Sequence, residues 1–339
     1  AVATEQRHLA SFAAVAPLQR SPAPQGTPRL ALPSSPLLSH GARDGPDHLQ
    51  ETTGSTLKRH PFKLLNRLSG CKLAEWRSER SLAQAERTGR KIRDADVTFV
   101  LDAWQFRRND KRINVIPVGQ GFVSSEMLGL VCIRAFSKLM VARQSRKYPM
   151  VTRLLCQYLY DNPPAGLPRG AHFPFTTICI NKDYAARRHR DTNNLGVSVV
   201  RAFGNFTGGR LRYWPEDPGP RKVPNVEALK EADAVVLDVK GRSVALNSTK
   251  AHEVEDFEGR RYSLVYFTVP RHETCDESVR RCLSKLCGLD INSDDVSEEI
   301  WRHVRQPSLT DKPIEQRSNL AKREARECDG RNARVSFRG

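Results

Sequence analysis

The period of the hydrophobic positions changes near residue 173. Between residues 73 and 164, apolar side chains recur at three- and four-residue spacing, which is the spacing of one helix face. From residue 173 onward, short segments rich in β-branched and aromatic residues take a two-residue period and are separated by turn residues. The pattern therefore predicts a helical region that precedes a β-rich region.

Three segments carry the helical pattern. The basic segment 73–95 has leucines and alanines at helical spacing, interrupted by Gly89. Segment 124–144 (SSEMLGLVCIRAFSKLMVARQ) opens with serine and has Glu126 shortly after, as a capped helix does. Segment 149–164 opens with one proline and stops at a double proline, so it also predicts a helix. We expect the last two helices to pack on the outside of the sheet that follows.

Five segments read as strands and are bounded by turn residues, namely 173–181, 196–203, 209–214, 234–239 and 261–269. Such a density of short strands is typical of an all-β sandwich or jelly roll. Segment 205–210 (NFTGGR) predicts a hairpin turn in which Gly208 and Gly209 take positive φ. The predicted fold class is mainly β with flanking helices, a helix-buttressed jelly roll.

The two ends of the chain are poorer in hydrophobic residues than the middle, and the chain as a whole is 39% hydrophobic. Residues 277–289 and 294–306 have the spacing of two short helices, and the last 30 residues read as disordered. The predicted organisation is a disordered leader at 1–55, a basic helical region packing on the core at 56–160, the jelly-roll domain at 161–272, and a charged, partly helical tail at 273–339.

Charge adds a possible class of partner. The formal net charge is +17, which attracts polyanions and speeds their encounter with the protein. The densest basic clusters are residues 106–112 (FRRNDKR) and 143–147 (RQSRK), and no aromatic platform accompanies them. Nucleic acid is therefore one candidate partner of the N-terminal half, and a solvated basic face is the alternative.

Cysteine usage and the first residues bear on the compartment. The eight cysteines are scattered, form no CxxC pair and fit no zinc spacing, which favours free thiols in an intracellular, reducing compartment. Residues 1–43 contain one acidic residue, Glu5. That composition fits disorder, with organellar targeting as the alternative. No run of 18 apolar residues occurs, so the sequence predicts no membrane span.

The candidate chemistry begins with His189-Arg190-Asp191. In an extended chain, residues two apart point to the same side, so an imidazole and a carboxylate are set together. His252 follows 61 residues after Asp191, a separation that lets a jelly roll return the chain to the same place. Two histidines and one carboxylate form the facial triad that holds Fe(II) and leaves positions open. Taken singly, the first motif fits a surface turn and the second a solvent-facing loop.

Arg261 opens the last predicted strand, nine residues after His252. The alternation of that strand places Arg261, Ser263 and Val265 on the inner face and Arg260 on the outer face. A buried guanidinium next to a hydroxyl can hold a carboxylate, as capture of the far carboxylate of 2-oxoglutarate requires. Alone, Arg261 fits a surface arginine. The order HxD, His and Arg-x-Ser within one β-rich segment is far more specific than any part.

With these motifs, segment 173–269 resembles the catalytic core of the 2-oxoglutarate- and Fe(II)-dependent oxygenase superfamily. Two phrases resemble the prolyl-hydroxylase branch, GGRLRYWPE and HEVEDFEGRRYSLVYFTV. Three phrases resemble the branch of base-J and TET-type oxidases of thymine and methylcytosine, HRDTNNLG, GNFTGGRL and RYSLVYFT. The resemblance does not extend to the leader, the basic helical region or the tail.

The resemblance implies a double-stranded β-helix, iron ligation by His189, Asp191 and His252, and 2-oxoglutarate binding by Arg261. It implies no catalytic side chain beyond the metal ligands. Asn181, Tyr184 and Asn194 lie near the motif in sequence and are expected to line the pocket, without assigned roles.

The implied activity is hydroxylation of an unidentified substrate, with O2 and 2-oxoglutarate consumed and succinate and CO2 released. Oxidation of a nucleic-acid base is one alternative, favoured by the basic helical region, and peptidyl-prolyl hydroxylation is another. A jelly roll that binds or interacts without turnover is the third alternative. The intact ligand set argues against it, and failure to bind iron would favour it.

Overall fold

The computed structural model describes residues 69–133 and 138–311. They belong to the compact unit Lys58–Gly339, one of two into which the chain divides. The predicted leader at 1–55 and the predicted disorder of the last 30 residues lie outside the described residues. None of the helices in the described ranges has the length and hydrophobicity needed to cross a bilayer.

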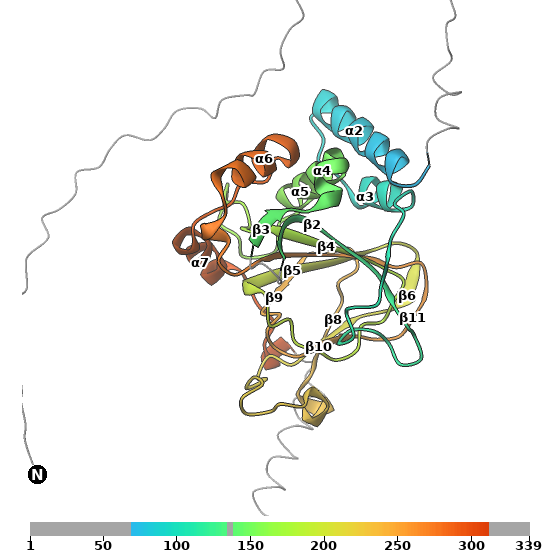
Figure 1. The fold of residues 1–339 in the computed structure, drawn as a ribbon. Coiled ribbons are helices and arrows are strands. Elements are labelled where there is room, and N and C mark those ends of the chain that lie inside the picture. The colour runs from blue at the N-terminus through green and yellow to red at the C-terminus, as the bar shows by residue number, and fades with distance from the viewer. Residues whose placement is uncertain (1–68, 134–137, 312–339) are drawn as a thin grey trace, which may run out of the picture. The chain divides into compact units, whose positions relative to one another are not determined.

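The helices predicted at 73–95 and 149–164 are confirmed. The first segment forms α2 (Gly70–Thr88) and enters α3 (Asp94–Leu101), and the second forms α5 (Pro149–Asp161) after the short α4 (Arg143–Lys147). Gly89 ends α2 with φ 64, a left-handed conformation that glycine adopts without strain. These helices gather over one face of the main sheet (Figure 1).

The helix predicted at 124–144 is wrong, because the segment forms strand β2 (Val123–Ile133) and reaches β3 (Lys138–Val141). Leu128 is buried on the helix side of β2, whereas Met127 lines a pocket on the other side. In a strand that is buried on both faces, apolar and polar residues do not alternate. The apolar residues of β2 happen to lie at helical spacing, and the segment was therefore predicted to be a helix. The predicted basic helical region 56–160 thus also contributes strands to the sheet.

Glu126 was also misassigned, because the sequence pattern predicted that it lies in the first turn of a capped helix. In the structure it caps no helix. Its buried carboxylate accepts hydrogen bonds from Trp104 Nε1 at 2.8 Å and Gln144 Nε2 at 3.1 Å. Both partners are distant in sequence, and only the folded chain brings them to Glu126.

The main sheet is antiparallel and has the strand order β1-β2-β4-β12-β5-β9, with β3 beside β2. It confirms the strands predicted at 173–181, 196–203 and 261–269. The bounds of its remaining strands are β1 (Arg108–Asn109), β4 (Thr177–Lys182), β5 (Leu195–Phe203), β9 (Val244–Leu246) and β12 (Tyr262–Thr268).

Two smaller sheets lie on the other side of the main sheet from the helices (Figure 1). One has the order β10-β7-β8 and the other pairs β11 with β6. Their bounds are β6 (Phe206–Gly208), β7 (Leu211–Tyr213), β8 (Val235–Leu237), β10 (His252–Val254) and β11 (Phe257–Gly259). The strands predicted at 209–214 and 234–239 are therefore confirmed.

The hairpin predicted at 205–210 is wrong, although Gly208 and Gly209 do take positive φ, of 78° and 64°. Strands β6 and β7 do not pair with each other. Both pair with the returning segment 252–259, and the two glycines interrupt that ladder. A Cβ on Gly209 would lie 3.0 Å from Arg261 Nε, so glycine lets the backbone pass close to this arginine.

Two hydrophobic clusters share the main sheet. The larger fills the space between the sheet and the helices, and Tyr266 OH donates to the Leu155 carbonyl oxygen of α5 at 2.9 Å. The smaller lies between the sheet and β6, β7 and β8. Strand β5 supplies both, with Val199 facing the helices and Val200 the smaller sheets. The β-strands hence have two buried faces, and the space between the sheets is where the site lies.

The helices predicted at 277–289 and 294–306 are confirmed as α6 (Glu277–Cys287) and α7 (Asp294–His303). Trp301 of α7 covers Gly196, where a Cβ would lie 2.2 Å from the indole. Four single 3-10 turns complete the described chain, at Val226–Ala228, Glu231–Asp233, His272–Thr274 and Leu309–Asp311.

Gly129 allows β2 to change partners. Residues up to Gly129 pair with β4, and residues from Leu130 pair with β3. Gly129 has φ 83, and a Cβ there would lie 2.5 Å from the Thr176 carbonyl oxygen. We expect Gly129→Ala to lower the free energy of unfolding by at least about 2 kcal/mol, measured by urea denaturation.

Gly121→Ala is the matched control, because a Cβ at Gly121 meets nothing within 4 Å and its φ is not in the left-handed region. Its free energy of unfolding should stay within about 0.5 kcal/mol of wild type. Equal effects of the two substitutions would contradict the role given to Gly129.

Candidate metal centre and pocket

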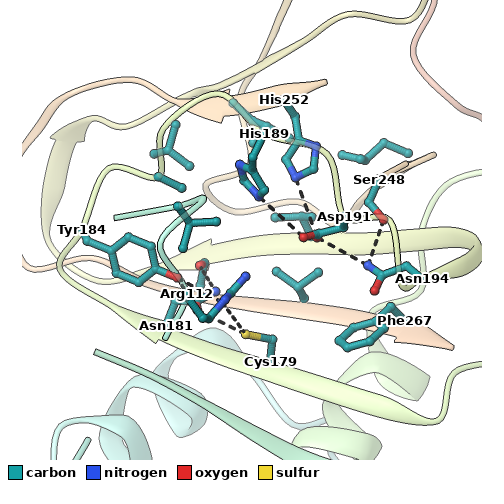
Figure 2. A pocket seen from close by; sticks show the side chains of 18 of the residues that line it. Arg112, Cys179, Asn181, Tyr184, His189, Asp191, Asn194, Ser248, His252 and Phe267 are labelled. Carbon is teal, nitrogen blue, oxygen red and sulfur yellow. Dashed lines mark hydrogen bonds and ion pairs between the residues drawn. The ribbon is translucent and has the colours of Figure 1, made fainter. Parts of the chain in front are cut away.

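His189, Asp191 and His252 come together in a pocket between the sheets (Figure 2). Their ligand atoms all lie within 4.8 Å of one another. One Asp191 carboxylate oxygen lies 3.7 Å from His189 Nε2, and the other lies 3.9 Å from His252 Nε2. Two imidazole nitrogens and a carboxylate oxygen converging in this way are the donor set of a facial triad.

Hydrogen bonds orient both imidazoles. His189 Nδ1 lies 2.6 Å from the Arg187 carbonyl oxygen, and His252 Nδ1 lies 2.9 Å from the Lys250 carbonyl oxygen. A carbonyl oxygen only accepts, so each Nδ1 carries the proton and each Nε2 presents a lone pair. Burial, and then the neighbouring His252, lower the pKa of His189 to about 3. His189 is therefore neutral near pH 7, as a metal ligand must be.

Backbone pairing sets the spacing of the two histidines. His189 and His252 face each other in an antiparallel bridge, with two N–H···O bonds of 3.0 Å. The bridge joins the segment at His189 to the outer edge of the β10-β7-β8 sheet. Asp191 is held by a further backbone bond from its N–H to the Ser248 carbonyl oxygen, at 2.9 Å. The motif therefore lies in extended chain, as the HxD spacing predicts.

The middle residue of the motif, Arg190, anchors this arrangement from behind. Its buried guanidinium donates to both oxygens of Asp217, at 2.7 and 2.6 Å. Asp217 also accepts from the Ala251 N–H at 2.7 Å, directly before His252. Although burial by itself raises the pKa of Asp217, these bonds lower it overall, so the pair is ionised. One carboxylate thus braces both strands that carry the histidines. Asp217 was not singled out from the sequence, and no motif there marks it.

Asn194 connects the Asp191 carboxylate to a chain of polar groups. Its Nδ2 lies 3.4 Å from an Asp191 oxygen and donates to Ser248 Oγ at 2.9 Å. Ser248 in turn contacts Ser198 Oγ at 2.9 Å. Asn194 lines the pocket, as expected, and limits the rotation of Asp191.

The pocket continues from the triad to the inner face of β12. Arg261, Ser263, Val265 and Phe267 all line it, which is the predicted alternation. Arg260 points away, with 54% of its side chain exposed. The rest of the wall is largely apolar, and includes Val200, Leu211, Leu246 and Val254.

Arg261 is a buried cation with no acidic partner among the described residues. Only 4% of the residue is exposed, its Nε has no hydrogen-bond partner, and its guanidinium lies over Phe206 and Phe257. Burial lowers the pKa of Arg261 to about 10, so the side chain is still charged near pH 7. An uncompensated buried charge is costly. A bound carboxylate would supply the missing partner, so the residues present fit a carboxylate ligand.

A polar cluster stands beside Arg261. Asn181 Nδ2 donates to Ser263 Oγ at 3.2 Å, and the Tyr184 hydroxyl donates to Asn181 Oδ1 at 2.7 Å. Ser263 Oγ accepts this bond, so its own proton is free for a ligand in the pocket. Asn181 and Tyr184 both line the pocket, as expected from the sequence.

Arg112 also lines the pocket and was missed as a site residue, because it was read as part of the charged cluster 106–112. It reaches Cys179 and Tyr184, which lie 67 and 72 residues further along the chain. No local spacing could reveal such a contact. The other basic residues of cluster 106–112, which are Arg107, Arg108 and Lys111, are exposed.

Comparison with known proteins finds similar solved structures but assigns no family to the chain. No protein-family model and no curated protein matches the chain. Solved structures that resemble it include an oxidoreductase of the 2OG-Fe(II) oxygenase family from Burkholderia pseudomallei, with 18% identity, coverage of 48% of this chain and 71% of that one, and a TM-score of 0.30. A Pseudomonas putida prolyl-4-hydroxylase has 16% identity, coverage of 57% and 87%, and a TM-score of 0.25.

NgTET1 in complex with 5mC DNA has 12% identity, coverage of 52% and 68%, and a TM-score of 0.28. Scores of this size assign no residue of the present chain.

The brace behind the triad can be tested with Asp217→Asn. The loss of charge weakens both bonds from Arg190 and the bond from Ala251, so the two histidines lose their common anchor. We expect Fe(II) affinity to fall by about 10- to 100-fold in anaerobic binding isotherms. Glu255→Gln is the control, because it breaks an exposed Arg210–Glu255 pair of 2.7 Å. It should leave Fe(II) affinity unchanged, and equal losses in both variants would contradict the brace.

Arg261→Met should stabilise the ligand-free protein, because it replaces a buried unpaired charge with an apolar side chain of similar length. We expect the free energy of unfolding in urea to rise by about 1–3 kcal/mol. Arg201→Met is the control, since half-buried Arg201 is paired with Asp94 at 2.8 and 2.9 Å and its loss should destabilise. Destabilisation by both substitutions would mean that Arg261 is already compensated.

Proposed function

We propose that this chain is an Fe(II)- and 2-oxoglutarate-dependent dioxygenase that hydroxylates a substrate and releases succinate and CO2. The observation that carries the proposal is the pairing of two features in one pocket. One is the donor set of His189, Asp191 and His252, and the other is Arg261, directly before β12, which has no acidic partner among the described residues. A metal-binding 2-oxo acid with a second carboxylate has the chemistry to engage both.

We propose a jelly roll of the double-stranded β-helix type as the fold, and the strand pairing supports it. Along the chain, the eight relevant segments are β4, the segment at His189, β5, β7, β8, β9, β10 and β12. The first pairs with the last, the second with the seventh, the third with the sixth and the fourth with the fifth. This nested order is that of a jelly roll. The proposed catalytic domain also includes β2, so it begins before residue 161.

In this proposal His189 and His252 hold iron through Nε2 and Asp191 holds it through a carboxylate oxygen. Bound iron would supply the redox chemistry that couples decarboxylation of 2-oxoglutarate to hydroxylation of a C–H bond by O2. The protein side chains bind and orient. Arg261 and the Ser263 hydroxyl would hold the far carboxylate of 2-oxoglutarate.

The apolar part of the wall serves a different purpose. Val200, Leu211, Leu246 and Val265 line the same pocket as the triad and Arg261. They keep bulk water from the bound co-substrate and lower the local dielectric, which strengthens the contact with Arg261. We assign no acid or base role to any side chain beyond the metal ligands.

A second candidate is oxidation of a nucleic-acid base by the same chemistry. The specific observation in its favour is that cluster 106–112 both delivers Arg112 to the pocket and exposes Arg107, Arg108 and Lys111 to solvent. Basic side chains next to the pocket could contact phosphates. Succinate release that rises on addition of DNA and falls with salt would favour this candidate over a peptide or small-molecule substrate.

The test is succinate release. Protein loaded with Fe(II) under anaerobic conditions receives 2-oxoglutarate and then O2, and turnover uncoupled from the primary substrate is measured. We expect His189→Ala to reduce the rate at least about 100-fold, because one ligand of three is lost. Arg261→Met should raise the 2-oxoglutarate concentration required by about 10-fold or more, because the distal carboxylate loses its cation.

His172→Ala is the control, since His172 contacts the ring of Tyr160 outside the pocket. It should turn over like wild type. Absence of both Fe(II) binding and succinate in wild type would overturn the proposal and favour a non-catalytic interaction protein. If wild type binds Fe(II) but releases no succinate, turnover requires the primary substrate, and DNA is the first substrate to add to the assay.

A further inference from the structure

The pocket contains a second guanidinium, that of Arg112, which enters from the loop between β1 and β2. Figure 2 shows it beside Tyr184, Asn181 and Cys179, below the triad. Arg261, directly before β12, lines the same pocket. Two cations in one pocket require an explanation, because the proposed distal carboxylate of the co-substrate uses only one of them.

The contacts of Arg112 are all with neutral groups. Its Nη1 donates to Ser125 Oγ at 3.0 Å and lies 3.4 Å from the Tyr184 hydroxyl and 3.5 Å from Cys179 Sγ. Within the described ranges, no carboxylate is in ion-pair contact with Arg112, and its Nε and Nη2 make no hydrogen bond. One edge of the planar fork therefore stays free to receive a carboxylate.

The position of Arg112 relates it to both ends of the pocket. Arg112 and the triad line the same pocket, and Figure 2 shows Arg112 below His189 and Asp191. Its contact with Tyr184, which donates to Asn181, connects it to Ser263 on the Arg261 side.

Charge balance points the same way. A divalent metal, Asp191, Arg112 and Arg261 together carry three positive charges. No other charged side chain of the described residues lines the pocket. The two carboxylates of 2-oxoglutarate would balance two of these charges, and an acidic primary substrate would balance the third. A pocket with mostly apolar walls holds such a charge at a cost unless an anion lies against it.

We propose that Arg112 is a second anion-binding group of this pocket, which takes a carboxylate on the metal side. This inference rests on the proposed function. Two molecules could bring the carboxylate. One is the co-substrate, through the carboxylate next to its keto group, and the other is an acidic primary substrate. In either case Arg112 positions its ligand through a two-pronged contact that a lysine cannot reproduce.

The test is equilibrium binding to the full chain loaded with Fe(II) without oxygen. Addition of 2-oxoglutarate is followed by the visible charge-transfer band of the iron chelate, for wild type and Arg112→Met. If the co-substrate supplies the carboxylate, the Kd for 2-oxoglutarate rises by about 10- to 100-fold. If the primary substrate supplies it, this Kd stays the same, and sodium acetate binds the 2-oxoglutarate-saturated wild type but not the variant, as shown by a shift of the band.

Lys111→Met is the matched control, because it removes an exposed positive charge at the adjacent position and Lys111 lines no part of the pocket. It should bind both probes like wild type. Arg112→Lys keeps the positive charge and should bind the probes more weakly than wild type but more tightly than Arg112→Met. This result would distinguish a two-pronged contact from an effect of the positive charge alone. Iron affinity of each variant shows that the triad is folded.

The inference is overturned if 2-oxoglutarate and acetate bind Arg112→Met and Lys111→Met equally. It is also overturned, together with the proposed function, if the wild-type protein binds no Fe(II), or if it binds Fe(II) but the loaded protein then binds no 2-oxoglutarate. The two failures are distinct, because the first leaves the wild-type iron chelate intact and the second removes it.

Discussion

The pairing of His189 with His252 is the constraint on which the site depends. Two backbone hydrogen bonds of 3.0 Å join residues that are far apart in the chain, and thereby fix the distance between the imidazoles. The Arg190–Asp217 pair makes this bridge rigid, since Asp217 bonds one strand through a guanidinium and the other through the Ala251 N–H. A buried ion pair often adds little net stability. Its contribution here is positional, because it holds two strands in one register.

Arg261 represents the opposite use of a buried charge. Arg190 is fully paired within the protein, whereas Arg261 has an unbonded Nε and a guanidinium that lies over aromatic rings. The fold therefore keeps one cation at a cost, in a position fixed by β12 and by the close approach of Gly209. Such unsatisfied charge is informative because stability alone does not favour it, and a ligand that supplies the counter-charge would recover the free energy.

The sequence predicted what depends on local pattern. Strand β12 followed from its alternation, and α2 and α5 followed from their spacing and from the glycine and proline at their ends. The gathering of His189 with His252 followed only from the order of motifs taken together. Strand β2 was missed because both of its faces are buried, and Glu126 imitated a helix cap. Asp217 and Arg112 were missed because their roles arise from contacts across the fold, which no spacing within one segment encodes.

The location of Arg112 changes how the flanking region is understood. A separate basic region would contribute only charge to the encounter with a partner. Instead β2 pairs with β4 inside the main sheet, and the loop before it places Arg112 against Tyr184. Loops carry specificity when a rigid scaffold holds their ends. The triad and Arg261 lie in or next to paired backbone segments and fit chemistry shared by many proteins. The loop before β2 instead supplies the feature by which the pocket could select its own substrate.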